Sequence, residues 1–198
     1  MFNDLITQRP DISTERKAKC DGGVEHVFSE GAVMLAFAFH LFATIPDLRS
    51  VFVHPDGEHL ARFDFKGWLN RQGFRLPEGE AVKGQAGLYS ADDGRTVMVN
   101  PRSGVGDVVA HLGGESFLAE CKGGVINTKH PGLVSRLRSG LCETVGLLLA
   151  TAQPAGQRQF AVVPATATTV ALAAKMRPRA AEAGIEIVLL DEHGRPVT

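Results

Sequence analysis

Apolar residues recur along the chain in spacings that predict an ordered mixture of helices and strands. Residues 30–45 are apolar nearly all round, which is typical of a buried helix, and Ser29 precedes them as a capping residue. Three further stretches predict helices: 58–72, 131–151 and 167–183. Pro178 lies inside the last of them and predicts a kink or break there.

Short apolar runs between these helices predict strands. They lie at 50–54, 86–90, 95–99, 107–112, 116–122, 159–165 and 185–191. The last three runs are apolar throughout, as strands are when both faces of their sheet are covered. The second half therefore runs strand, strand, helix, strand, helix, strand, which predicts an α/β fold with a mixed central sheet flanked by helices.

The length of 198 residues suits one α/β domain with an added segment. Residues 1–23 are polar and predict an arm or an irregular lead-in. We expect residues 1–57 to form an N-terminal arm, a buried helix and a strand that pack on a core domain of residues 58–198. The extra N-terminal helical segment is the helix at 30–45.

Composition and charge narrow the class of protein. The longest apolar run, 31–45, is too short to span a membrane and is interrupted by His40. Three cysteines without a CxxC pair predict reduced thiols, and we expect a soluble, cytoplasmic protein that does not bind a membrane. The net charge of −1 counts against a protein that coats nucleic acid, but it allows an enzyme that contacts a few phosphates through a local patch.

Charged residues interrupt the two apolar runs between residues 106 and 124. A hairpin that turns at Gly113 and Gly114 places Asp107 directly across from Glu120, with Cβ atoms about 4.5–5.5 Å apart. Two carboxylates this close repel each other, and such a pair usually shares a proton, a basic side chain or a metal ion. Lys122 projects from the same face of its strand as Glu120.

This group of side chains suits hydrolysis of a phosphodiester. Oxygen ligands from Asp107 and Glu120 are suited to Mg²⁺ or Mn²⁺. Lys122 can hold a water molecule, help to deprotonate it, or stabilise developing negative charge. The simpler interpretation is a structural salt bridge between Lys122 and one of the acids. The opposed acid, the apolar strand and the small residues that follow Lys122 favour the metal site.

The segments "GDVVA" and "FLAECK" resemble the PD-(D/E)xK nuclease superfamily, which has the restriction-endonuclease-like fold. The nearest likeness is to archaeal-type Holliday-junction resolvases and to nuclease domains of modification-dependent restriction enzymes. The likeness covers about residues 58–190 and implies that Asp107 and Glu120 bind the metal while Lys122 assists the attacking water. Gly106 stands where the family has proline.

The resemblance also implies a further carboxylate from the first core helix. Glu58 is the candidate, and Glu30 replaces it if the earlier helix is the true counterpart. Either residue could instead be an acid favoured at a helix start by the helix dipole. A second Asp-x-Lys, at residues 64–66, falls in the predicted helix at 58–72, where residues two apart do not face each other.

The leading hypothesis is a Mg²⁺-dependent DNA endonuclease of restriction, defence, repair or recombination, acting as a homodimer if both strands are cut. The alternative is a catalytically inactive nuclease-like module that binds nucleic acid or a partner protein. A hydrolase of another substrate on an α/β scaffold is a third hypothesis. Lys129, Arg136 and Arg138 open the helix after the predicted site and could either meet phosphates or form a solvated helix face.

Overall fold

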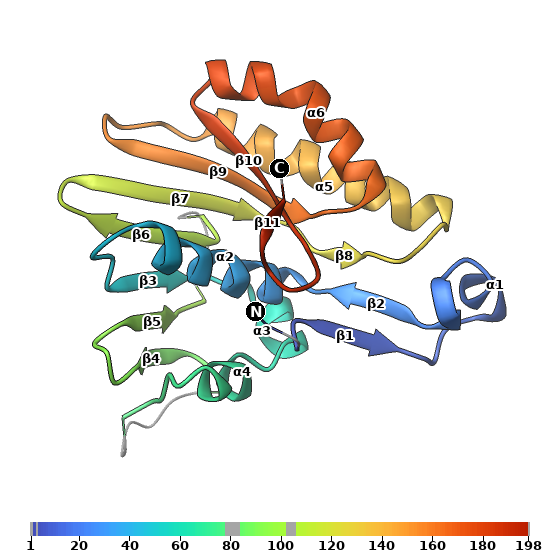
Figure 1. Ribbon diagram of the computed structural model, residues 1–198, viewed down its shortest axis with the longest axis horizontal. Helices are drawn as coiled ribbons and strands as arrows, with labels where there is room; N and C mark the ends of the chain where they lie inside the picture. Colours follow the sequence, from blue (N-terminus) through green and yellow to red (C-terminus); the bar gives the residue numbers. More distant parts are fainter. Residues whose placement is uncertain (1, 3, 78–83, 102–105, 198) are drawn as a thin grey trace.

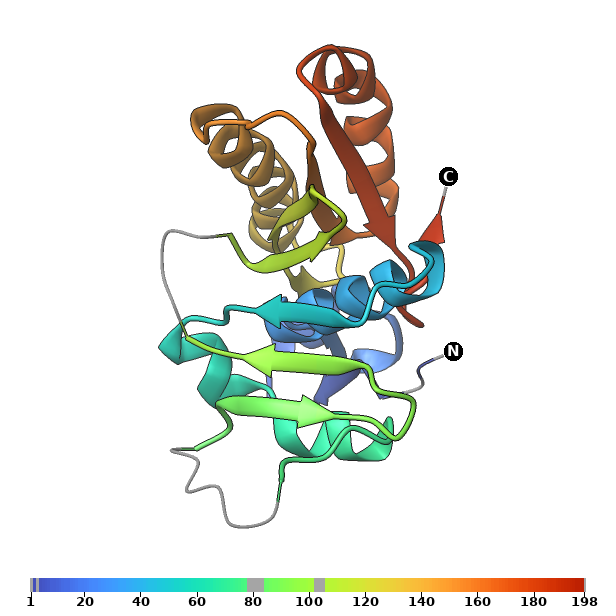
Figure 2. The same cartoon turned by 90° about the vertical axis from the view of Figure 1, so that its left-hand side faces the viewer.

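A large mixed sheet forms the centre of the computed structural model, which describes residues 2, 4–77, 84–101 and 106–197 (Figure 1). Its described strands, in spatial order, are β11 (Pro196–Val197), β10 (Ile185–Leu190), β9 (Gln157–Pro164), β7 (Glu115–Cys121), β6 (Val108–Leu112), β3 (Ser50–Val53), β5 (Thr96–Val99) and β4 (Gly87–Ser90). The β7–β9, β9–β10 and β3–β5 pairs are parallel and the others antiparallel. The predicted mixed α/β class is confirmed, and β3, β5 and β4 lie side by side in Figure 2.

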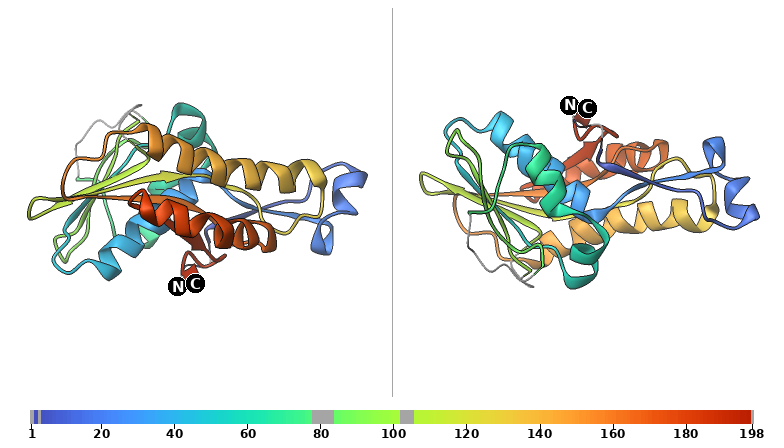
Figure 3. Two further views of the ribbon diagram at one scale, coloured as in Figure 1. Left: turned by 90° about the horizontal axis from the view of Figure 1, so that it is seen from above. Right: turned by 90° about the horizontal axis from the view of Figure 1, so that it is seen from below.

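Helices cover both faces of the strands β7, β9 and β10, which explains their apolar sequences. On β9, Phe160 and Val162 belong to the core that contains α2 (Glu30–Thr44). Ala161 and Val163 belong to a second core beneath α5 (Pro131–Ala150) and α6 (Ala167–Glu182). Helices α5 and α6 lie side by side (Figure 3). Alternate residues of each strand thus enter different cores, and both faces are mostly apolar.

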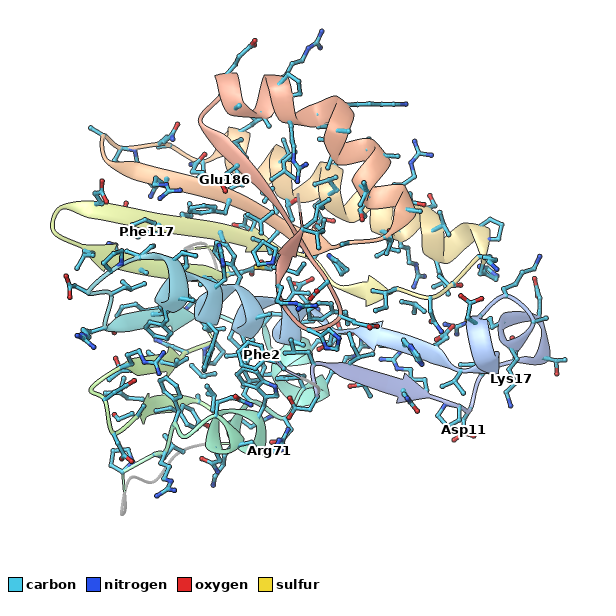
Figure 4. All side chains as sticks on the ribbon, viewed as in Figure 1. Phe2, Asp11, Lys17, Arg71, Phe117 and Glu186 are labelled. Carbon is cyan, nitrogen blue, oxygen red and sulfur yellow. The ribbon has the colours of Figure 1, made fainter. Side chains whose placement is uncertain are left out.

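The described part of the polar lead-in forms regular elements, so of its two interpretations, an arm or an irregular segment, the structure shows an arm. A small sheet has the order β1 (Ile6–Arg9), β2 (Glu25–Phe28) and β8 (Gly124–Val125), with α1 (Thr14–Lys17) and a 3-10 helix (Asp21–Gly23) between its first two strands. Strand β1 has no buried residue, so its sequence shows no alternation of apolar and polar positions. Its antiparallel pairing with β2 holds it in the extended conformation. We call residues 6–28 the arm; Asp11 and Lys17 lie at its far end (Figure 4).

The helix predicted at 58–72 is in fact two helices, α3 (Gly57–Arg62) and α4 (Phe65–Arg71). Phe63 has extended backbone angles, and the Asp64 carboxylate accepts the N–H of Gly67 at 2.8 Å to begin α4. The break lets Phe63 and Phe65 both enter the core. The helix is therefore interrupted between Arg62 and Phe65, where the side chains of Phe63 and Phe65 are both buried.

The remaining predicted helices and the hairpin of β4 and β5 are confirmed. Helix α6 is continuous through Pro178, so the expected break is absent. The segment 1–57 supplies α2 and the central strand β3, and both belong to the main core. Within the described residues, no helix is long and apolar enough to cross a membrane.

We expect Pro178→Ala to raise the free energy of unfolding by about 1–2 kcal/mol, because alanine restores a backbone N–H and removes the steric conflict of an internal proline. Urea unfolding measures the change. Pro131→Ala is the matched control: Pro131 occupies the start of α5, where the missing N–H costs nothing, so this change should not stabilise the protein. An unchanged or lower stability for Pro178→Ala would contradict the account.

Candidate active site

The hairpin of β6 and β7 has the predicted register. Val108 pairs with Ala119, so Asp107 and Glu120 lie at the same end of the hairpin. The Asp107 N–H donates to the carbonyl of Ala119 at 2.9 Å, and its Oδ2 accepts the N–H of Cys121 at 2.7 Å. These two bonds hold the Asp107 side chain over the end of β7.

Gly106 has a conformation that explains why proline cannot stand before Asp107 in this chain. Its φ is +84°, which proline's ring forbids and which costs other L-residues strain. A Cβ there would also overlap the Leu118 side chain. Glycine at this position therefore suits the local backbone, and proline does not.

Lys122 follows β7 and meets Glu30, the first residue of α2. Its Nζ lies 3.3 Å from Glu30 Oε2 and 3.5 Å from Glu143 Oε1 of α5. The Glu30 side chain is only 10% exposed. Helices α2 and α5, which are far apart in sequence, thus each bring one glutamate to the ammonium group of Lys122.

Glu58 does not join this group and needs correction as the preferred third carboxylate. It is exposed on α3 and forms an i,i+4 ion pair with Arg62. The structure instead places the rival, Glu30, against Lys122. The physical reason is that α2, not α3, begins where the chain after β7 approaches it.

Two glycines make room for this arrangement. A Cβ on Gly123 would lie 2.5 Å from the backbone nitrogen of Glu30 and would overlap the carbonyl of Phe28. A Cβ on Gly140 of α5 would lie 3.1 Å from Cβ of Lys122. Gly123 therefore allows the backbone after β7 to touch the start of α2, and Gly140 allows α5 to pass close to the lysine.

The acids of the site ionise with difficulty. Burial raises the pKa of Asp107 to about 7, opposed by the Cys121 N–H and reinforced by the charge of Glu30. Burial, together with the charge of Asp107, likewise raises the pKa of Glu120 to about 7. Burial also raises the pKa of Glu30 to about 7, although Lys122 opposes the shift. A cation placed here would relieve this mutual repulsion.

Lys122 is held in its charged form. Burial alone would lower its pKa, but Glu30, Glu143 and Asp107 outweigh burial and raise the pKa above its ordinary value. An ammonium of this kind donates hydrogen bonds and stabilises negative charge. It does not serve as the base that removes a proton from water at neutral pH.

The donor set of the site matches a hard divalent cation. Asp107 and Glu120 offer carboxylate oxygens, and Mg²⁺ commonly binds through one or two carboxylates with water and substrate phosphate completing its shell. As the side chains are placed, the described residues contain no group of three His, Cys, Asp or Glu that could hold a metal ion. Asp107 and Glu120 thus offer two carboxylates, and water and substrate would have to supply the other ligands of an ion.

Glu143 and His59 are neighbours of the site that sequence reasoning missed. His59 Nδ1 lies 3.4 Å from Glu30 Oε1 and 2.8 Å from Asp56 Oδ1. Neither residue belongs to a motif, because each reaches Lys122 or Glu30 only through the packing of α5 or α3. Lys129, by contrast, is exposed and pairs with Asp21 at 3.4 Å, away from the site.

Comparison with known protein families, with curated proteins and with solved structures found no match.

We expect Gly123→Ala to lower the free energy of unfolding by about 1–3 kcal/mol, because the new methyl group would have to displace backbone atoms. Gly146→Ala on α5 is the control. Its Cβ would meet nothing within 4 Å, so helix propensity should make it stabilising by up to about 1 kcal/mol. Chemical denaturation of both variants measures the contrast, and a tolerated Gly123→Ala would show that the contact is not close.

The raised carboxylate pKa values predict a stability that falls as pH rises. Protonation favours the folded state, so the contribution of Asp107 and Glu120 to stability is full below about pH 4, falls as the pH approaches 7, and is lost above it. We expect Glu120→Gln to stabilise the metal-free protein at pH 8 by on the order of 1 kcal/mol and to have little effect at pH 4. Glu115→Gln, an exposed acid at the other end of β7, should change neither value. Chemical denaturation in EDTA at pH 4 and pH 8 measures the free energy of unfolding of each variant. An equal effect of Glu120→Gln at the two pH values would refute the account.

Proposed function

We propose that the protein is a Mg²⁺-dependent DNA endonuclease with the restriction-endonuclease-like fold. The observation that carries the proposal is the convergence of Asp107, Glu120 and Lys122, with Glu30, at one end of the β6–β7 hairpin. Carboxylates whose pKa is raised by burial and by a neighbouring acid are costly to a fold, and such groups concentrate at functional sites.

The arrangement of elements around the site supports this fold. The hairpin β6–β7 is followed by α5, then the parallel strand β9, then α6 and the parallel strand β10. Both crossover helices cover the same face of the sheet. This is the order that the resemblance to PD-(D/E)xK nucleases implies for residues after the Glu-x-Lys segment.

In this proposal Asp107 and Glu120 hold Mg²⁺ or Mn²⁺. The ion supplies a water of lowered pKa and neutralises charge on a phosphate oxygen. Lys122 keeps its proton, donates a hydrogen bond at the reacting phosphate and stabilises the negative charge that develops there. Glu30 fixes the ammonium in place by its contacts with Nζ.

DNA is the proposed substrate, with a role in restriction, defence, repair or recombination. Cutting both strands of a duplex would require two such sites, and a homodimer is the simplest way for a chain with one site to supply them. The overall charge of −1 requires that DNA be met through a local basic surface.

A catalytically inactive module that binds nucleic acid or a partner protein is the second candidate. One observation favours it: Lys122 is engaged by two glutamates, as in a structural ion-pair network. In that case the acids would stabilise the lysine and no cutting would occur.

The test is cleavage of supercoiled, linear duplex, single-stranded and branched DNA with Mg²⁺ or Mn²⁺. We expect metal-dependent cutting by the wild type and a loss of about 10²-fold or more in Lys122→Ala and Glu120→Gln. The first change removes the ammonium group at the reacting phosphate, and the second removes a carboxylate that would hold the ion. Glu115→Gln and Lys175→Ala, which alter exposed residues, are the matched controls and should cut normally. Cutting that survives Lys122→Ala and Glu120→Gln would contradict the site, and a folded wild type that cuts no DNA would favour the binding module.

A further inference from the structure

A pocket of about 260 Å³ opens beside the candidate active site, between the arm, α3 and the start of α5. Arginines from four different elements line it: Arg9 of β1, Arg16 of α1, Arg62 of α3 and Arg136 of α5. Figure 3 shows how this arises, because the arm extends alongside the N-terminal half of α5. The sequence separates these residues so widely that only the folded chain brings them together.

One of these arginines is fixed by a buried acid. The Arg16 guanidinium lies 2.5 Å from Glu25 Oε1, and the Glu25 side chain is fully buried in β2. Arg9 lies across from Glu25 in the β1–β2 register. A buried carboxylate without a cation would strongly destabilise the arm, so Glu25 holds Arg16 at the rim of the pocket.

The other arginines leave positive charge for a ligand. Arg62 pairs with Glu58, whereas Arg9 and Arg136 form no ion pair with any described residue. Helix α5 also begins here, with Leu133 of its first turn in the pocket wall, and its dipole adds positive potential. The pocket is therefore a basic site on a chain whose net charge is −1.

The inner end of this pocket reaches the candidate active site. Glu30 lines the pocket and also contacts Lys122 Nζ. Gly123 and Gly124, which directly follow Lys122, form part of the same wall. The pocket and the candidate site therefore share Glu30 and the backbone that follows Lys122.

We infer that this pocket binds a phosphate group of the substrate strand, adjacent to the phosphate that is cut. The inference rests on the proposed function. Guanidinium groups match phosphate oxygens with paired hydrogen bonds, and arginines from several directions enclose such a group better than a flat basic surface. The apolar wall of Val27, Val125 and Leu133 suits the sugar that adjoins the phosphate.

The phosphate can be internal or can be the 5′ terminal group of a strand, and binding experiments separate these sources. Oligonucleotides labelled at the 3′ end, with either a 5′ phosphate or a 5′ hydroxyl, are titrated with the full chain in EDTA so that no cutting occurs. The test variant is Arg9→Ala with Arg136→Ala, since both residues are exposed and their removal leaves no buried acid unpaired. Arg179→Ala, an exposed arginine of α6 that does not line the pocket, is the matched control.

We expect the double variant to bind at least about 10-fold more weakly than the wild type. The slope of log K against log salt should become shallower by about 0.7–0.9 for each phosphate that the variant no longer neutralises. The control should bind as the wild type does. If the wild type prefers the oligonucleotide with a 5′ phosphate and the double variant does not, the pocket binds a terminal phosphate. If the double variant binds both oligonucleotides equally more weakly, the pocket binds an internal phosphate.

Three results would overturn the inference: a wild type that binds neither oligonucleotide, a double variant that binds like the wild type, or an equal weakening by Arg179→Ala. Circular dichroism of each variant checks that the fold is retained. Binding that depends on Arg9 and Arg136 in a protein that never cuts DNA would support the pocket while refuting the nuclease. Cutting that persists without any effect of these arginines would refute the pocket alone.

Discussion

The close contact between the backbone at Gly123 and the start of α2 is the constraint on which the site depends. A side chain at residue 123 would collide with the backbone of Phe28 and Glu30, so only glycine lets the chain leave β7 at this point. The contact joins the small sheet to the large one, since β8 follows directly and pairs with β2. It also brings Glu30 to Lys122 and forms part of the wall of the arginine pocket.

Charge balance at the site follows from this contact. Burial raises the pKa of Asp107, Glu120 and Glu30 to about 7, and the charge of Glu30 adds to the shift of Asp107 as that of Asp107 adds to the shift of Glu120. Lys122 partly compensates them and in return keeps its own charge. The fold thus places three acids and one lysine beside a pocket lined by four arginines. Such a pair of neighbouring sites suits a ligand that carries phosphates and takes a divalent cation with it.

Much of the fold and part of the site could be predicted from the sequence. The apolar period of α2 and α5, the turn at Gly113 and Gly114, and hence the pairing of Asp107 with Glu120, all depend on local patterns. The strands of the predicted N-terminal arm could not be predicted, because β1 is exposed and is held in place by its pairing with β2. The choice of Glu30 over Glu58 depends on a backbone contact between residues about ninety positions apart, which no local period encodes.

Binding of Mn²⁺ to the full chain, measured by electron paramagnetic resonance, tests the central claim most directly, because it reports on the carboxylates without requiring the correct DNA. The account predicts that the wild type binds Mn²⁺ at neutral pH and that Asp107→Asn with Glu120→Gln abolishes the binding, while Glu115→Gln retains it. A wild type that binds no Mn²⁺, or binding that survives removal of both acids, would contradict the claim that these carboxylates form a metal site.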